Sequence, residues 1–128
     1  MVNRQTPSLS FEVFPPNPAV GNDKIFQALR EMQDLAPHFI SVTASNNKFD
    51  IEETTVRLAE FISNDLEIPT IAHLPAVYLT KEMVSNILQA LDRVGVNQIL
   101  ALRGDIFPDV APKDDFKYAT DLIEYIKT

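Results

Sequence analysis

Glu12 is the one carboxylate within an apolar run that spans residues 9–14. Alternate residues of a strand point to opposite faces of a sheet, so Glu12 lies opposite Phe11 and Val13. That apolar pair suits a face packed on helices, which directs Glu12 toward the inside of a sheet or barrel. A carboxylate in such a place loses hydration, which favours its protonated form and makes it a candidate general acid. The pattern fits equally well an exposed edge strand on which Glu12 is solvated.

Two further polar residues stand at the ends of apolar runs. His73 can contact a cofactor or act as an acid or base, although a lone histidine is more often a core residue with a backbone partner. Thr43 can orient a ligand through its hydroxyl, but threonine is also an ordinary strand former. His38 falls at the opposite end of the predicted strands and receives no role.

The tripeptide Arg103-Gly104-Asp105 ends the last apolar run and opens a long loop. Arginine suits a phosphate or a carboxylate, and glycine lets the backbone approach a ligand closely. Aspartate can meet a polarised ring or a ribose. The alternative is a surface turn with a local ion pair, because a match of three residues is weak by itself.

Composition and charge exclude several other chemistries. The chain has no cysteine, so disulfides and cysteine nucleophiles are excluded, and no paired cluster of ligands predicts a metal site. The net charge of −7 argues against binding to nucleic acids or to anionic membranes. The first residues lack the apolar run of a signal peptide, and no stretch is long enough to span a bilayer, so we expect a cytoplasmic protein.

Four short apolar runs alternate with segments of helical periodicity. With 128 residues, of which 45% are hydrophobic, the chain is long enough for one domain with a core. The runs begin about 30 residues apart, the length of about one βα unit. This alternation predicts an α/β fold with a parallel sheet. The predicted strands are 9–14, 39–43, 70–74 and 99–102, and the predicted helices are 22–35, 51–64, 81–94 and 116–127.

Local signals mark the ends of three of these helices. Asp50 stands where a capping box would begin the second helix. Thr80 is placed to cap the third helix, and Gly95 to end it. Asp114 or Asp115 precedes the fourth helix. Each of these residues is suited to satisfy backbone groups that a helix end leaves unpaired.

The loops that lead from a strand to a helix are longer and more varied than those that lead back. They span residues 15–21, 44–50, 75–79 and 103–113. In parallel α/β folds such loops lie at the carboxyl ends of the strands, where ligands bind. We therefore predict that the candidate residues named above gather at this rim.

The strand ends together resemble those of the methylenetetrahydrofolate reductase family. They fall in the family's order and spacing and span nearly the whole chain. The sequence departs from the family after Thr43, where Ala44 and Ser45 stand in place of an aromatic residue and a glycine. The similar segments are the strand ends 10–16, 41–43, 72–74 and 100–105, and the helix start 118–122.

The resemblance implies a (β/α)8 TIM-type barrel that binds FAD at its carboxyl rim. Members of the family take hydride from NADH or NADPH and pass it to 5,10-methylenetetrahydrofolate, which yields 5-methyltetrahydrofolate for methionine synthesis. By this resemblance Glu12 is the acid that helps to open the five-membered ring of the folate. Asp105 contacts the flavin and the folate, where its charge tunes hydride transfer and stabilises a cationic intermediate. The other implied flavin contacts are Thr43, His73, Leu102, Arg103, Gly104, Tyr118 and Ala119.

Length limits what this resemblance implies. A closed barrel of this type needs about 250 residues. The length of the chain therefore predicts half of a barrel, which is a single partial domain over residues 1–128. The first and fourth strands of such a half would keep open edges, and its inner face would be bare. We therefore expect self-association, with two copies completing an eight-stranded assembly.

Two alternatives stay open beside a reductase or a part of one. The first is a non-catalytic half-barrel that binds flavin or folate weakly or only self-associates. The second is an unrelated flavodoxin-like domain, which suits the length of the chain. Against it, residues 14–18 are too rich in proline to offer the row of backbone N–H groups that binds a phosphate.

Overall fold

Four parallel strands form a single sheet in the computed structural model, which describes residues 7–17, 19–44 and 50–128. Their order is β1-β2-β3-β4, so each strand pairs with the next one along the chain. A sheet wound in one direction is the arrangement of a barrel, whereas a flavodoxin-like domain places its first strand between the second and third. The flavodoxin-like alternative is therefore wrong. The strands are β1 (Ser10–Val13), β2 (Phe39–Val42), β3 (Thr70–Pro75) and β4 (Gln98–Leu102).

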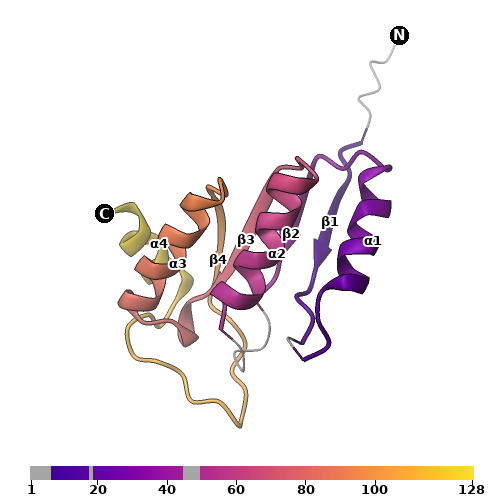
Figure 1. Cartoon of the computed structure of the whole chain (residues 1–128). Helices are drawn as coiled ribbons and strands as arrows, with labels where there is room; N and C mark the ends of the chain where they lie inside the picture. Colours follow the sequence, from indigo (N-terminus) through magenta and orange to yellow (C-terminus); the bar gives the residue numbers. More distant parts are fainter. Residues whose placement is uncertain (1–6, 18, 45–49) are drawn as a thin grey trace.

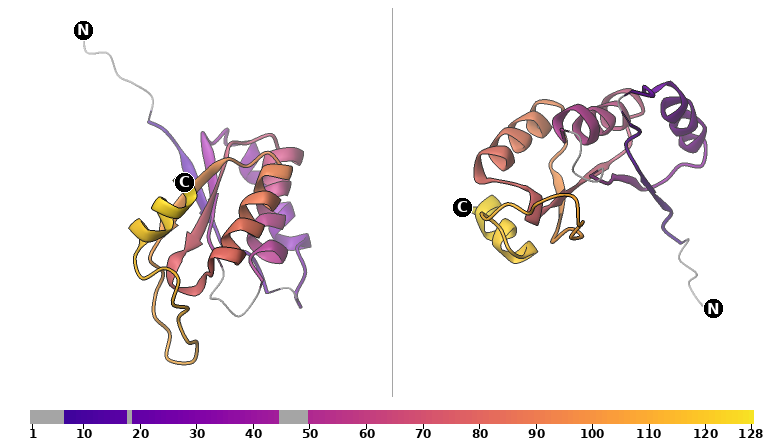
Figure 2. Two further views of the ribbon diagram at one scale, coloured as in Figure 1. Left: turned by 90° about the vertical axis from the view of Figure 1, so that its left-hand side faces the viewer. Right: turned by 90° about the horizontal axis from the view of Figure 1, so that it is seen from below.

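Three helices cover one face of this sheet. α1 (Asp23–Gln33), α2 (Arg57–Glu60) and α3 (Lys81–Arg93) lie in an arc along that face, and α4 (Ala119–Lys127) follows beyond α3, beside β4 (Figure 1; Figure 2). None of the helices in the described ranges is long and apolar enough to span a bilayer. The predicted α/β class with four βα units is confirmed, and the arrangement is that of part of a TIM-type barrel.

The core lies between the sheet and the helices. Strand residues that face the helices are fully buried, among them Ile40, Val42, Ala72 and Leu74. They pack in one cluster with buried helix residues, which include Leu29, Leu58, Ile62 and Val84. The opposite face of the sheet, called the inner face below, exposes large apolar side chains. Phe14, Leu100 and Leu102 are 67%, 45% and 37% exposed there.

The alternation predicted for β1 is confirmed. Val13 is buried at 5% exposure and Phe11 packs against the core. Glu12 lies on the inner face, where its side chain is 54% exposed. The carboxylate therefore points in the predicted direction. We expected an inward carboxylate to lose hydration. The described residues leave Glu12 hydrated, because none of their elements covers the inner face over β1.

The second helical segment differs from a regular α-helix. Residues 52–65 are helical, close to the predicted 51–64, but π-helical turns at Glu52–Val56 and Phe61–Asp65 flank α2. In a π-helical turn each bond reaches five residues back, as the N–H of Val56 does to the carbonyl of Ile51 at 3.0 Å. The hydroxyl of Thr55 in this segment donates to the carbonyl of Thr43 at 3.0 Å. This bond ties the helical segment to the end of β2.

The predicted signals at Thr80 and Gly95 are confirmed, whereas the second helical segment begins with Ile51 as its N-cap and without the capping box predicted at Asp50. Asp50 Oδ1 accepts a hydrogen bond from the N–H of Glu52 at 2.8 Å, and Thr80 Oγ1 accepts one from the N–H of Met83 at 3.1 Å. Gly95 follows α3 with a φ of +78°, a left-handed conformation that glycine adopts readily. Local side-chain chemistry thus determines where α3 begins and ends.

The fourth helix begins later than predicted, at Ala119 instead of residue 116. Asp121 caps it, because its carboxylate accepts bonds from two preceding backbone N–H groups at 3.1 and 2.9 Å. The prediction that Asp114 or Asp115 starts this helix is wrong. Asp115 accepts a bond from the N–H of Lys81 at the start of α3, at 2.8 Å. That partner is 34 residues away along the chain, which local spacing does not reveal.

Candidate active site

A cavity of about 760 Å³ opens on the inner face at the carboxyl ends of the strands. Parallel pairing creates it, because the carboxyl ends of neighbouring strands meet at one edge. Val42 pairs with Ala72 in the sheet, which places the following residues, Thr43 and His73, side by side. Six of the residues predicted for a site line the cavity: Glu12, Thr43, His73, Leu102, Gly104 and Asp105.

Two buried polar atoms in this cavity lack a hydrogen-bond partner. Thr43 is 9% exposed and His73 is 4% exposed, and both line the cavity. Within the part of the chain that the structure describes, Thr43 Oγ1 and His73 Nε2 are the buried side-chain atoms without a partner. Buried polar groups in proteins are nearly always hydrogen-bonded, and leaving one unpaired costs about 1–3 kcal/mol. Two such atoms on neighbouring strands point to a polar ligand.

Glu12 and His73 approach each other across the inner face. Glu12 Oε1 lies 3.8 Å from His73 Nε2. Burial of the imidazole lowers the pKa of His73 below its ordinary value, and the negative charge of Glu12 opposes this effect only in part. The imidazole is therefore neutral at pH 7. A neutral ring can either donate or accept a hydrogen bond at Nε2, depending on its tautomer.

Gly104 brings the backbone after β4 against the loop after β3. Its φ is +90°, and a Cβ atom added there would lie 2.9 Å from Cβ of Pro75 and 3.3 Å from Val77 Cγ2. No side chain fits without displacing this contact, so close backbone approach is the reason for glycine here. The glycine holds residues 103–105 against the wall of the cavity.

We expect Gly104→Ala to lower the free energy of unfolding by about 1–3 kcal/mol more than Gly95→Ala does. Both glycines have positive φ, so both substitutions carry a similar backbone strain. The two positions differ in the room available for a side chain, because nothing lies within 4 Å of a Cβ atom added at Gly95. Urea unfolding of the two variants and the wild type measures the difference. Equal losses would mean that close packing at Gly104 contributes nothing.

Tyr78, which sequence reasoning missed, holds the loop that carries Asp105. The Tyr78 hydroxyl donates to the backbone carbonyl of Asp105 at 2.7 Å and accepts from the N–H of Phe107 at 2.9 Å. The aromatic rings of Tyr78 and Phe107 also stack, with their centroids 6.3 Å apart. Tyr78 is 5% exposed, so one buried hydroxyl fixes the backbone on both sides of Ile106. The sequence signal that could have identified Tyr78 is an aromatic residue within a loop of the rim that carries the candidate site.

Tyr78→Phe should loosen this loop, because it removes both hydrogen bonds and keeps the ring. We expect the free energy that protects the Phe107 amide from hydrogen exchange to fall by about 1–3 kcal/mol. Tyr125→Phe is a matched control: its hydroxyl bonds to Ser85 and to the carbonyl of Lys81, away from the loop. Unchanged exchange at Phe107 in Tyr78→Phe would show that the hydroxyl does not hold the loop.

Arg103 and Tyr118 lie in a second hollow, of about 450 Å³, and not in the cavity of Glu12. Its lining includes Lys113 and Lys117, which add positive charge to that of Arg103, and Asp114, whose negative charge offsets part of it. The side chain of Tyr118 is exposed, with the ammonium of Lys117 5.7 Å from its ring centre. Ala119 is half-buried as the first residue of α4. The other predicted cofactor residues are divided between two hollows, and Ala119 lines neither of them.

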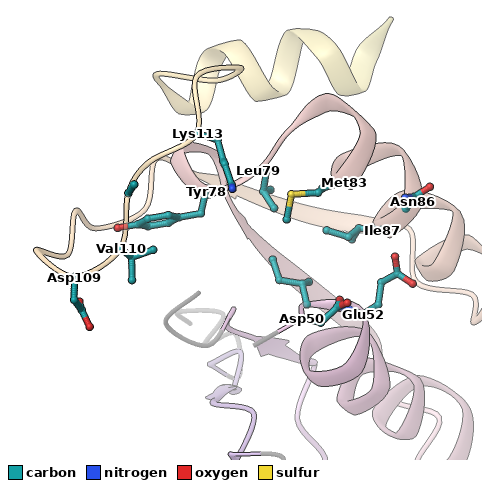
Figure 3. Close-up of a pocket in the computed structure, with 12 residues that line it drawn as sticks. Asp50, Glu52, Tyr78, Leu79, Met83, Asn86, Ile87, Asp109, Val110 and Lys113 are labelled. Carbon is teal, nitrogen blue, oxygen red and sulfur yellow. The ribbon is translucent and has the colours of Figure 1, made fainter. Parts of the chain in front are cut away.

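A third cavity, of about 650 Å³, lies between the start of the second helical segment, α3 and the loop 109–113 (Figure 3). Apolar side chains such as Met83 and Ile87 line it, and the carboxylates of Asp50 and Glu52 lie across from them (Figure 3). None of the residues predicted for a site lines this cavity. The candidate chemistry therefore lies at the inner face.

The fold and the cavity define a barrel-type α/β protein with a candidate ligand site at the carboxyl ends of the strands. Residues 1–128 match the family described as methylenetetrahydrofolate reductase. The chain belongs to this family, as its strand ends predicted.

Individual relatives agree with the family match. The chain is 34% identical over 122 residues to the 5,10-methylenetetrahydrofolate reductase of Buchnera aphidicola subsp. Baizongia pistaciae, which covers 94% of this chain and 40% of the relative. It is 32% identical to methylenetetrahydrofolate reductase 1 of Schizosaccharomyces pombe and 30% identical to a probable methylenetetrahydrofolate reductase (NADH) of Oryza sativa subsp. japonica. These alignments cover 93% and 92% of this chain and 20% of each relative. The chain thus spans less than half the length of these relatives.

The departure from the family after Thr43 falls partly within the described structure. Ala44 is half-buried and lines the cavity beside Thr43. Ser45 and the rest of residues 45–49 lie outside the described residues. Ala44 thus places a small side chain at this wall of the cavity, where the family has an aromatic ring.

Proposed function

We propose that the chain forms part of a flavin-dependent enzyme that reduces 5,10-methylenetetrahydrofolate to 5-methyltetrahydrofolate with NADH or NADPH. The observation that carries this proposal is the pair of unpartnered buried atoms, Thr43 Oγ1 and His73 Nε2, in the cavity that also holds Glu12 and Asp105. Thr43 Oγ1 supplies a polar contact for a ligand, His73 Nε2 supplies one for a polar group beside it, and the two carboxylates supply proton transfer and negative charge. Membership of the family supports the reaction class.

The lining of the two adjoining hollows fits FAD. Thr43 Oγ1 offers a hydrogen bond to a flavin, and the exposed side chain of Leu100 offers apolar surface to its ring. Arg103 and Lys117 in the second hollow suit phosphates. When bound, FAD would carry hydride from the nicotinamide to the folate. The rice relative is named for NADH, which supports NADH as the donor.

In this proposal Glu12 supplies the proton for ring opening. Opening the five-membered ring breaks a bond between carbon and nitrogen, and the nitrogen keeps the electron pair and takes a proton. The carboxylic acid of Glu12 gives that proton and becomes a carboxylate. The carboxylate of Asp105, which lines the same cavity, stabilises the positive charge that develops on the folate.

Flavin retention tests the proposal directly. Protein incubated with FAD and desalted should stay yellow and should oxidise NADH with a quinone acceptor. Thr43→Val keeps the shape of the side chain and removes the unpartnered hydroxyl, so it should weaken retention of FAD. Thr120→Val makes the same change at an exposed position of α4 and should retain FAD as the wild type does. A colourless protein after incubation contradicts the proposal.

We further propose that residues 1–128 act as a partial domain, in the cytoplasm, and associate with a second copy of the chain. Apolar Phe14, Leu100 and Leu102 are exposed on the inner face, and β1 and β4 are the edges of the described sheet. Both features favour association, since an open edge and an apolar patch each invite a partner. Sedimentation velocity at micromolar concentration should reveal a dimer or larger species. A compact monomer counts against self-association.

A non-catalytic half-barrel is the second candidate function. The exposure of Glu12, at 54%, favours it, because a general acid works best when water is excluded. Calorimetry with the folate distinguishes the two: binding without turnover in the presence of FAD and NADH would support the non-catalytic function. Turnover would exclude it.

A further inference from the structure

We propose that His73 is a positioning residue that holds the carboxyl group of Glu12 through Nε2 of its imidazole. This inference rests on the proposed role of Glu12 as the acid. The starting observation is that Glu12 Oε1 and His73 Nε2 lie 3.8 Å apart although they belong to β1 and β3, which do not pair.

The strand between them leaves room for this approach. Neighbouring strands lie about 4.8 Å apart, so β1 and β3 are separated by about twice that distance. At the level of the pair, β2 presents Ser41, which pairs with Glu12, on the inner face, and Thr43 follows the strand beside His73. Both side chains are small, so the longer side chain of Glu12 reaches diagonally over β2. A bulky residue at either position would separate the carboxyl from the imidazole.

The two groups complement each other in burial. His73 is 4% exposed, and its Nε2 has no partner among the described residues. The Glu12 side chain is 54% exposed, so it can turn at little expense in packing. A small rotation that closes the gap from 3.8 Å to hydrogen-bond distance satisfies the buried nitrogen. The imidazole is therefore the fixed member of the pair and the carboxyl the mobile one.

The charge state of His73 suits a residue that positions an acid. Among the described residues, Glu12 on β1 and Asp105 after β4 are the titratable groups that share its cavity, and Thr43 after β2 contributes a hydroxyl there. Burial lowers the pKa of His73, so the ring stays neutral at pH 7. A neutral ring can accept the O–H of protonated Glu12, whereas a cationic ring would hold Glu12 as a carboxylate and oppose proton donation.

Imidazole NMR tests the pair without any cofactor or turnover. The chain has two histidines, His38 and His73, so their ring signals can be followed separately through a pH titration. Because the charge of Glu12 raises the pKa of His73, Glu12→Gln should lower that pKa further. The His38 signal should not respond to the substitution. Asp105→Asn removes a carboxylate from the same cavity and should leave the pKa of His73 unchanged.

Two NMR results would overturn the inference. In the first, His73 titrates identically in wild type and Glu12→Gln. In the second, Asp105→Asn shifts it as much as Glu12→Gln does, which would mean a general field in the cavity and no specific pair. Failure of the proposed function is seen separately, as a protein that retains no FAD. If His73 still responds specifically to Glu12→Gln in such a protein, the contact between Glu12 and His73 is supported and the proposed function is contradicted.

Kinetics of the flavin-loaded protein provide the second test. His73→Leu should slow folate reduction and alter its pH profile more than it slows flavin reduction by NADH. His73→Gln places an amide group near Nε2 whose oxygen can accept the O–H of Glu12, so it should restore part of the folate step. Equal loss of both steps in His73→Leu, without rescue by His73→Gln, would mean that His73 only holds the flavin and would overturn the inference.

Discussion

Glu12→Gln should abolish folate reduction by the flavin-loaded protein and leave flavin reduction by NADH intact. A positioned general acid contributes about 10²–10⁴-fold to a rate. Glutamine keeps the shape of the side chain but cannot give the proton that the leaving nitrogen needs. Stopped-flow absorbance of the flavin follows the two steps separately, first with NADH and then with the folate. We expect the loss in the second step alone.

A matched control separates chemistry from charge. Glu31→Gln makes the same change at an exposed position of α1, outside the cavity, and should affect neither step. Because the Glu12 side chain is 54% exposed, its substitution should change the free energy of unfolding by less than about 0.5 kcal/mol. Equal loss of both steps in Glu12→Gln would show that Glu12 is structural and that another group supplies the proton.

Leu74→Ala should lower the free energy of unfolding by about 2–5 kcal/mol, whereas Leu100→Ala should lower it by less than about 1 kcal/mol. Leu74 on β3 faces the helices and has no exposed surface, so its loss leaves a cavity in the core. Leu100 on β4 lies on the inner face and is 45% exposed, so water replaces what is removed. Urea unfolding of both variants at low protein concentration measures the difference.

The same pair of variants reports on what covers the inner face. If Leu100→Ala proves as destabilising as Leu74→Ala, Leu100 is buried in solution and a second copy covers it. We then expect the loss for Leu100→Ala to grow with protein concentration, because association stabilises the folded state by mass action. A small loss at every concentration would show that the inner face stays open, against the proposed self-association.

Short-range patterns in the sequence predicted the elements and most of the site. Apolar runs of strand length and periodic helices lie within a few residues of the observed bounds, with α4 as the main exception. Alternation in β1 correctly directed Glu12 away from Val13, since a strand can bury only one set of alternate residues when helices cover one face. The strand ends also predicted the rim at which six candidate residues meet.

Such local patterns could not predict contacts between residues that are far apart in the sequence. Alternating strands and helices allow several strand orders, and only the pairing of β2 with β3 excluded the flavodoxin-like order. Asp115 was assigned to the wrong helix because its partner at Lys81 is remote in sequence. The role of Tyr78 was missed for the same reason, since its hydroxyl meets Asp105 and Phe107 from 27 and 29 residues away.

The sequence by itself therefore determined the class of fold, the family and the residues that carry the candidate chemistry. These follow from residue type, period and order along the chain, which are local properties. Tertiary structure alone decided that Thr43 and His73 keep unpartnered buried atoms, that Glu12 reaches His73 over β2, and that Arg103 and Tyr118 lie in a separate hollow. Those facts depend on distances across the sheet, which no spacing along the chain encodes.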